Sequence, residues 1–278
     1  MRVLRHSVHY AALSVIAVVT LFPIYWMFMS SLRAESEMFR YTELSWKVFL
    51  PVDWTLANFK DIFLDPEKPF TRYMINTFIM AGTVTAAGLL INSAAAFAFA
   101  KLRFPFKRLV LVVFLSTLAI PPEVVMVPQY LIIRDMHALN TFAGLIMPSI
   151  VWVFGIFMLT QFFADIPRDI LDAARIDGSS WLRIYTRIVL PGAVPALITL
   201  GIITFTHQWD SLLWPLIIIS DDTKQVVQAV ISSYTSDQEK HWGKIVAAAS
   251  ASSLPILTVF LFLQKYYVRG VMMSGVKG

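Results

Sequence analysis

Six long runs of apolar residues constrain this chain more than any other feature. Each is close to the ~20 residues that a helix needs to cross a ~30 Å hydrocarbon core. Because a helix satisfies its own backbone hydrogen bonds in lipid, such runs are typical of spanning helices. The predicted spans are 9–30, 73–99, 109–127, 142–163, 192–219 and 245–267. The sequence therefore predicts an all-α, polytopic membrane protein with six transmembrane helices in one domain, residues 1–278.

The amino-acid composition is also typical of a membrane protein. Hydrophobic residues make up 57% of it and charged residues 15%, whereas soluble domains have about 45–50% and about 25%. There is no cysteine, which excludes disulfides and cysteine-ligated metals. The net charge of +5 follows the predicted membrane topology, so it does not indicate a nucleic-acid partner.

The first run has two interpretations, a signal peptide or a retained anchor. Arg2 and Arg5 precede it, as in a signal peptide. The run is longer than the ~7–15 residues of a signal core, and no A-x-A-like cleavage site follows, which favours the anchor. Proline and glycine inside the spans, such as Pro195 and Pro255, are expected to be tolerated because neighbouring helices can satisfy the freed backbone groups.

The distribution of lysine and arginine predicts the orientation of the spans. With a cytoplasmic N-terminus, the inside segments hold 13 of the 23 basic residues. The tightest cluster is Lys101, Arg103, Lys107 and Arg108, between the second and third spans. Because short cytoplasmic loops are enriched in such residues, both termini are predicted to be cytoplasmic.

The segment 165–191, between the fourth and fifth spans, is too polar to cross the membrane. Pro167 suits a first helical turn, and Asp169 and Asp172 suit the early turns that favour carboxylates. Gly178 suits a left-handed stop, after which Ser179 or Ser180 can cap a second helix that Pro191 closes. The sequence predicts a helix–glycine–helix hairpin on the inner membrane face.

This hairpin resembles the EAA loop of ABC importer permeases. The shared elements are Asp172-Ala173-Ala174, Asp177-Gly178 and Leu190-Pro191. The first position is aspartate where the family has glutamate, so the charge is kept on a shorter side chain. The resemblance implies that these residues form the coupling helix that docks on a separate ATPase. The alternative is an amphipathic helix that lies on lipid head groups.

Shorter motifs resemble the carbohydrate-uptake, maltose-permease-like branch of the same family. They are Asn76-Thr77, residues 97–105, Trp209-Asp210, Leu213-Trp214-Pro215-Leu216, Trp242-Gly243 and the end of the chain. The resemblance implies a sugar or sugar-like solute, without specifying which one. It also implies that the tail contacts the ATPase dimer interface through Gly275, Val276, Lys277 and Gly278.

The resemblance implies a set of partners in a bacterial-type cytoplasmic (inner) membrane. They are a second permease subunit, two ABC ATPase subunits, an extracytoplasmic solute-binding protein and a small-molecule solute. ATP and Mg would bind the ATPases, and this chain would be a non-catalytic subunit without a cofactor or metal. Accordingly, the sequence contains no G-x-x-x-x-G-K-[ST] phosphate-binding loop and no H-E-x-x-H motif.

Ionisable residues inside a span are costly and indicate function. On a continuous fifth helix, one face would carry His207, Asp210, Ser211 and Trp214. This face either lines the solute pathway or holds helices together through pairing of Asp210 with His207 or with the partner subunit. A different function, an ion-coupled secondary transporter, would use His207 and Asp210 as a proton relay.

Overall fold

A computed structural model describes residues 2–41, 43–236 and 240–275. Within these ranges the regular structure is helical, with one isolated β-bridge between Arg33 and Trp54 and no strand. The chain divides into two compact units. Unit 1 comprises Met1–Met74 and Ala229–Pro255, and unit 2 comprises Ile75–Gln228 and Ile256–Gly278.

Three uninterrupted helices are long and apolar enough to cross a membrane. They are α1 (Arg2–Ser31), α4 (Phe70–Lys101) and α15 (Trp242–Gly275). They coincide with the first, second and sixth predicted spans, so the sequence located these three helices correctly.

The other apolar segments form three bent pairs of helices. The first pair joins α5 (Lys107–Ser116) to α6 (Pro122–Asp135), and the second joins α7 (Phe142–Ile146) to α8 (Val153–Ala164). In the third pair, residues Trp181–Gly192 lead into α12 (Val194–Trp209). The bends are 104°, 41° and 78°. The described residues thus contain three continuous spans, and up to six if each bent pair is one span.

The third predicted span, 109–127, is wrong as a continuous helix. The helical segment ends at Ala119, and α6 begins at Pro122 in a new direction. Proline disfavours the α conformation of the residue before it. Ile120, which precedes Pro121, accordingly has extended dihedrals of φ −89° and ψ 119°.

The fifth predicted span, 192–219, is also interrupted. Helix α12 ends at Trp209, Asp210 is its C-cap, and the separate helix α13 covers Leu213–Ile218. Pro215 explains the interruption, because its ring lacks an N–H and would clash with the carbonyl of Ser211 in a continuous helix. His207, Asp210, Ser211 and Trp214 therefore do not share one face of a single helix, which corrects the prediction.

A side chain of α4 stabilises the break before α8. Asn92 is buried; its Nδ2 donates to the carbonyl of Ile150 at 3.2 Å, and its Oδ1 accepts from the backbone N–H of Trp152 at 3.1 Å. Unsatisfied backbone groups are costly inside a bilayer. Asn92 therefore supplies one partner to the backbone on each side of residue 151 in the break.

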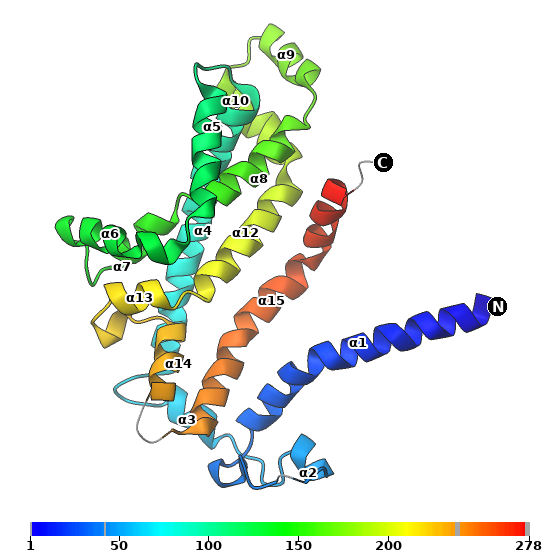
Figure 1. Ribbon diagram of the computed structural model, residues 1–278, viewed down its shortest axis with the longest axis vertical. Helices are drawn as coiled ribbons and strands as arrows, with labels where there is room; N and C mark the ends of the chain where they lie inside the picture. Colours follow the sequence, from blue (N-terminus) through cyan, green and yellow to red (C-terminus); the bar gives the residue numbers. More distant parts are fainter. Residues whose placement is uncertain (1, 42, 237–239, 276–278) are drawn as a thin grey trace. The chain divides into compact units, whose positions relative to one another are not determined.

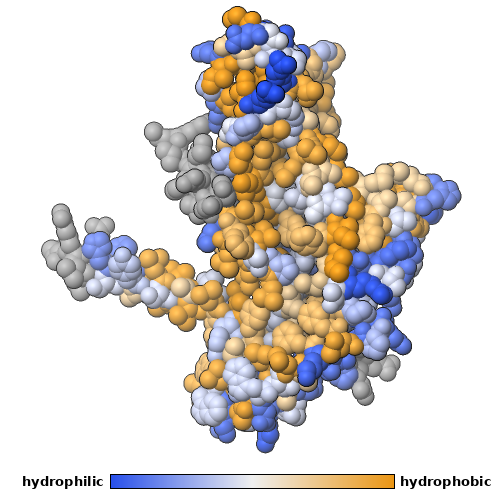
Figure 2. Space-filling model, turned by 180° about the vertical axis from the view of Figure 1, so that it is seen from behind, coloured by the Kyte–Doolittle hydropathy of each residue, from blue (hydrophilic) through white to orange (hydrophobic). Residues whose placement is uncertain are grey.

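Within unit 2, helices α4, α5, α8 and α12 run side by side (Figure 1). Helices α9 (Arg168–Ile176) and α10 (Trp181–Ile184) lie at one end of this bundle, and α6, α7 and α13 lie toward the other. In Figure 2 the long flank of the bundle is largely apolar, while polar and apolar residues are mixed at the end with α9. This distribution suits helices surrounded by lipid or by another membrane subunit.

The connection after α13 is fastened to the start of α4. Asn76 donates from Nδ2 to the carbonyls of Thr223 and Gln225, both at 2.9 Å. Thr77 Oγ1 accepts from the backbone N–H of Val227, which begins α14 (Val227–Ser236). The pair Asn76-Thr77 therefore has a structural role in unit 2.

Unit 1 holds the beginning of α15 with a distant carboxylate. Glu35, in the 3-10 turn Glu35–Glu37, accepts from the backbone N–H groups of Trp242 and Gly243 at 2.9 and 2.7 Å. These N–H groups have no partner within their own helix, and an acidic group stabilises a helix N-terminus. Two short helices lie between α1 and α4 in the chain: α2 (Trp46–Phe49) and α3 (Ala57–Phe63).

Gly243→Ala is expected to destabilise unit 1. A Cβ there would collide with the side-chain amide of Asn58 and lie 2.7 Å from the Glu35 carboxylate. Asn58 cannot move freely, because it is buried and donates to the carbonyls of Ser31 and Arg33. Overpacking of this kind costs about 1–3 kcal/mol, so the midpoint of thermal unfolding in detergent should fall.

Gly82→Ala is the matched control, since a Cβ at Gly82 in α4 has nothing within 4 Å. There, alanine should stabilise the helix by up to ~1 kcal/mol. Equal unfolding midpoints for the two variants would contradict the predicted collision at Gly243.

Candidate functional site

The polar segment between α8 and α12 forms the predicted hairpin, whose first leg is α9. We define the hairpin as residues 165–191. Pro167 is the N-cap residue of α9, one position before the predicted first turn, and Asp169 lies in that turn. A carboxylate at this position interacts favourably with the helix dipole.

Gly178 ends the first leg in the left-handed conformation, with φ +82°. The N–H of Ser179 donates to the carbonyl of Ala174 at 2.9 Å, and the N–H of Gly178 donates to that of Arg175 at 3.0 Å. These two bonds define a Schellman motif, which favours glycine at this position. The predicted left-handed stop is confirmed.

The second leg begins at Ser180, whose Oγ accepts from the N–H of Arg183, as predicted for a cap. Helix α10 then leads into a π-helical turn, Tyr185–Val189, and the short helix α11, Leu190–Gly192. The prediction that Pro191 closes the helix is wrong, because the helix continues to Gly192. The π turn contains Arg187, whose carbonyl the Pro191 ring would meet in a regular helix.

The hairpin is seated on the helices of unit 2. Leu171 and Ile184 are buried, and they join a hydrophobic cluster with Phe97, Leu159 and Phe163. The main apolar contact of α9 is therefore with protein. This contact disfavours the alternative in which α9 lies on lipid head groups with its apolar face in the membrane.

The opposite face of α9 is exposed. It carries the EAA-like residues Asp172 and Ala173, together with Ile176. Ile176 is 87% exposed, and Leu182 on the second leg is 70% exposed. Exposed apolar side chains at a polar hairpin suggest a protein partner. Ile176 and Leu182 were not predicted as site residues, because spacing alone does not show which apolar residues the core leaves uncovered.

The turn itself is rigidified by Arg175. Its Nη1 donates to the carbonyl of Ser179 at 2.9 Å, and its guanidinium lies 5.1 Å from the ring centroid of Trp181. A cation over an aromatic face is attracted by the ring quadrupole. Arg175 thus joins the two legs, and the other predicted residues of the hairpin, Asp177 and Leu190-Pro191, lie in the turn and at the end of the second leg.

The polar and aromatic residues predicted on the fifth span lie around the break after α12. The ring of His207 stacks on that of Trp152, with centroids 5.6 Å apart. Asp210 Oδ1 accepts from Gln228 Nε2 at 3.3 Å, so its hydrogen-bond partner is Gln228 and not His207. His207 and Asp210 are both exposed. The structure therefore adds Trp152 and Gln228 to the polar and aromatic residues of this region.

Ser211 and Trp214 are more enclosed than these two residues. Ser211 donates its backbone N–H to the carbonyl of Gln208, and Trp214 Nε1 donates to the carbonyl of Gly144 in α7 at 3.2 Å. The indole of Trp214 therefore fastens α13 to α7. This contact assigns Trp214 a structural role within the chain.

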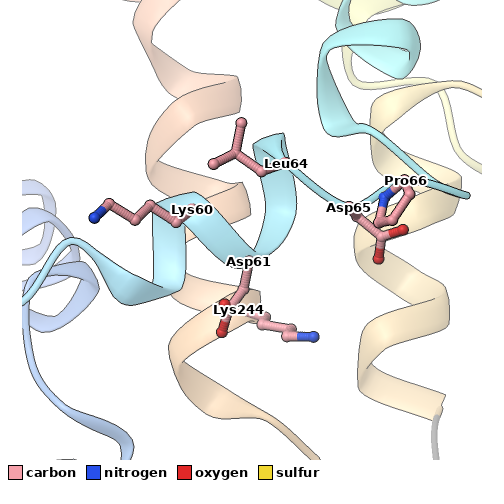
Figure 3. Close-up of a pocket in the computed structure, with 6 residues that line it drawn as sticks. All are labelled: Lys60, Asp61, Leu64, Asp65, Pro66 and Lys244. Carbon is pink, nitrogen blue, oxygen red and sulfur yellow. The ribbon is translucent and has the colours of Figure 1, made fainter.

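A shallow cavity of about 470 Å³ lies in unit 1 (Figure 3). It is lined by Lys60, Asp61, Leu64, Asp65, Pro66 and Lys244. The backbone N–H groups of Lys68 and Glu67 donate to the Asp65 carboxylate and lower the pKa of Asp65. These bonds hold the Asp65 carboxylate within its own turn.

A second cavity, of about 320 Å³, lies in unit 2. Its lining is almost wholly apolar and includes Leu89, Gly201 and Phe205. Neither of these two cavities includes His207 or Asp210, and both side chains are exposed in this chain.

The described residues contain no group of three or more metal-ligating side chains. Of the predicted tail, Gly275 is the last residue of α15, whereas Val276, Lys277 and Gly278 lie outside the described residues.

Comparison with known families gives a match over most of the chain. The profile of the family described as "Binding-protein-dependent transport system inner membrane component" matches residues 86–273. This range includes the hairpin and the region of His207.

Two curated relatives match along nearly the whole chain. One is the probable ABC transporter permease protein YurM of Bacillus subtilis (strain 168), 31% identical, with 92% of this chain and 84% of the relative covered. The other is the sn-glycerol-3-phosphate transport system permease protein UgpE of Salmonella typhi. It is 33% identical, with 92% of each chain covered.

Two solved structures have a similar fold. One is a crystal structure of a bacterial ABC transporter involved in the import of the acidic polysaccharide alginate. Its TM-score is 0.82 at 21% identity, over 95% of this chain and 96% of that chain. The other is a bacterial alginate ABC transporter in complex with an alginate pentasaccharide-bound periplasmic protein. Its TM-score is 0.68 at 17% identity, over 94% of each chain.

Proposed function

The chain belongs to the family of binding-protein-dependent transport system inner membrane components, and we propose that it forms one half of the translocation pathway of an ABC importer. Members of this family are multi-pass permeases without a cofactor of their own. Transport would be driven by ATP and Mg bound to two separate ATPase subunits. The observation that carries this proposal is the exposed face of the rigid hairpin.

The hairpin is the element that docks on an ATPase. Asp172, Ala173 and Ile176 are exposed on one face of α9 while Leu171 is buried beneath them. The small side chain of Ala173 allows close approach, and Ile176 offers an apolar contact. A force applied to this face would pass through Leu171 and Ile184 into the hydrophobic cluster, and so into the spanning helices. The proton-relay alternative is not supported, since a relative that matches 92% of this chain is named as an ABC transporter permease.

The region of His207 and Asp210 supplies part of the solute path. Aromatic rings stack on sugars, and a carboxylate accepts hydrogen bonds from hydroxyl groups. The exposed stack of His207 on Trp152 and the exposed carboxylate of Asp210 offer both kinds of contact. A second permease subunit would complete the path, because the side chains of His207 and Asp210 are exposed in one chain.

The solute is a sugar or a sugar-like molecule. The relatives' names support this class, since they include sn-glycerol 3-phosphate and alginate. A solute-binding protein would deliver it from outside the cell, as the periplasmic protein in the alginate complex suggests. Both termini would be cytoplasmic, and the tail at Gly275–Gly278 would lie near the ATPases.

A single-cysteine cross-link tests the docking face. The chain has no native cysteine, so Ala173→Cys introduces one reactive thiol on the exposed face. In membranes that contain the whole transporter, a short cross-linker with one maleimide and one photoreactive benzophenone should join this thiol to an ATPase subunit, because the benzophenone inserts into C–H bonds and needs no second thiol. Leu44→Cys is the control, because Leu44 is 89% exposed and belongs to the predicted extracytoplasmic loop. Failure at Ala173, or a cross-link from Leu44, would contradict the proposal.

A further inference from the structure

Lys101 is a buried cation at the base of the hairpin. It is the last residue of α4 and is 7% exposed. Its Nζ donates to the carbonyl of Ala164 at 3.1 Å and to that of Ile166 at 2.6 Å. Ala164 ends α8, and Ile166 belongs to the connection that leads into α9. Lysine is rarely buried unless it is paired, so these two bonds account for its position.

The acceptors are carbonyl groups that need a donor. The last carbonyls of a helix have no partner within that helix, and a cation near a helix C-terminus interacts favourably with the helix dipole. Lys101 meets both requirements at the end of α8. The ammonium group therefore fixes the point at which the chain leaves the bundle and enters the hairpin.

Two more residues of α4 contact the other leg of the hairpin. The hydroxyl groups of Ser93 and Tyr185 are 2.7 Å apart. The ring of Phe97 lies 5.3 Å from that of Tyr185 and 6.3 Å from that of Trp181. Ser93, Phe97 and Lys101 are spaced by four residues, so they form one stripe along α4. This stripe contacts the connection that precedes the first leg, at Ile166, and the second leg, at Trp181 and Tyr185.

The contacts of Ser93, Phe97 and Lys101 differ in how strongly they resist movement of the hairpin relative to α4. Ring packing at Phe97 has no strict direction. Ser93 has a further partner, because its hydroxyl also lies within bonding distance of the carbonyl of Leu89 in its own helix. The bonds of Lys101 are charge-assisted, and their two acceptors lie on either side of the exit from α8. Lys101 is therefore the contact that resists tilting of the hairpin.

We propose that Lys101 is the positioning residue that transmits displacement of the hairpin to α4. This inference rests on the proposed docking of the hairpin on an ATPase. With Lys101 in place, a push on α9 moves α4 and α8 together. Without it, the connection 165–167 absorbs the displacement, and ATP is hydrolysed without transport.

Lys101→Met tests this role in the complete transporter reconstituted into liposomes with its binding protein and solute. Methionine keeps an unbranched apolar side chain but has no donor. The solute molecules imported per ATP hydrolysed should fall about tenfold, which corresponds to ~1.4 kcal/mol of lost coupling. The ATPases should still co-purify, and amide hydrogen exchange at residues 165–178 should accelerate. Lys101→Arg should restore most of the transport ratio, because it can still donate to both carbonyls.

Lys107→Met is the matched control. Lys107 Nζ also donates to a carbonyl at a helix end, that of Leu102 at 3.0 Å, and the charge change is the same. Its contact stays within the turn between α4 and α5, so the transport ratio should not change. An unchanged ratio in Lys101→Met, or an equal fall in both variants, would overturn the proposal.

Two further measurements separate the possible causes of failure. If Lys101→Met does not accumulate in the membrane, Lys101→Gln replaces it, because its shorter amide cannot reach both carbonyls. The Ala173→Cys cross-link is repeated in the Lys101→Met background. A cross-link without coupled transport supports the role of Lys101. If the cross-link is absent even with Lys101 present, docking itself is wrong.

Discussion

Replacing Gly178 by valine is expected to lower solute uptake strongly while leaving the chain in the membrane. Gly178 has φ +82°, and an L-residue in the left-handed region costs about 1–2 kcal/mol. That cost corresponds to roughly a 5- to 30-fold smaller population of the native turn. A β-branched residue is among the least tolerant of this conformation. Uptake of labelled solute and ATPase activity in proteoliposomes measure the effect.

The surroundings of Gly178 separate backbone strain from steric bulk. A Cβ at this position has nothing within 4 Å in the chain, so the fold itself has room for a side chain. Asparagine tolerates the left-handed conformation, and Gly178→Asn should therefore retain more uptake than Gly178→Val. If both variants are inactive, close approach by the ATPase and not the backbone conformation is decisive.

Gly192→Ala is the control for a glycine near the same hairpin. A Cβ at Gly192 also has nothing within 4 Å, and the residue is not among those with positive φ. The Gly192→Ala variant should therefore take up solute at the normal rate. Normal uptake by Gly178→Val would show that the turn does not carry the coupling.

Substitution of Ile176 is expected to weaken the binding of the ATPase strongly. This residue is 87% exposed in the chain, and burial of an isoleucine side chain in an interface contributes about 1.5–3 kcal/mol. Ile176→Gln should therefore weaken binding of the ATPase by roughly 10- to 100-fold. Glutamine is a good helix former and adds no charge at the helix end. Titration of purified ATPase onto the reconstituted permease measures the affinity.

Leu44→Gln is the matched control for Ile176→Gln. Leu44 is exposed to a similar extent, 89%, but lies in the predicted extracytoplasmic loop. Its substitution should leave the affinity unchanged. An ATPase that binds Ile176→Gln as tightly as the original chain would exclude Ile176 from the docking face.

The sequence predicted best those features that depend on neighbouring residues. Hydrophobic length located α1, α4 and α15, because each is a long, uninterrupted apolar run. The turn at Gly178 and the cap at Ser180 were also predicted, since each is determined by residues within one or two helical turns. Local chemistry along the chain was therefore enough to place the hairpin.

The errors have a common physical cause. The predicted spans 109–127 and 192–219 ran through Pro121 and Pro215, but a helix ends before each of these prolines. The prediction of one polar face on the fifth span is wrong because this span is not one continuous helix. Contacts between distant segments, such as Asn92 with Trp152 or Lys101 with Ile166, leave no periodic signal. They become visible only when the helices are packed.

The cap of α15 has a consequence for the order of synthesis. Glu35 emerges from the ribosome early, and its partners Trp242 and Gly243 emerge some 200 residues later. A contact of such long sequence separation is intrinsically slow to form. The two bonds of Glu35 can therefore form only after the beginning of α15 has been synthesised. In a chain truncated before Trp242, Glu35 lacks both of these hydrogen-bond donors.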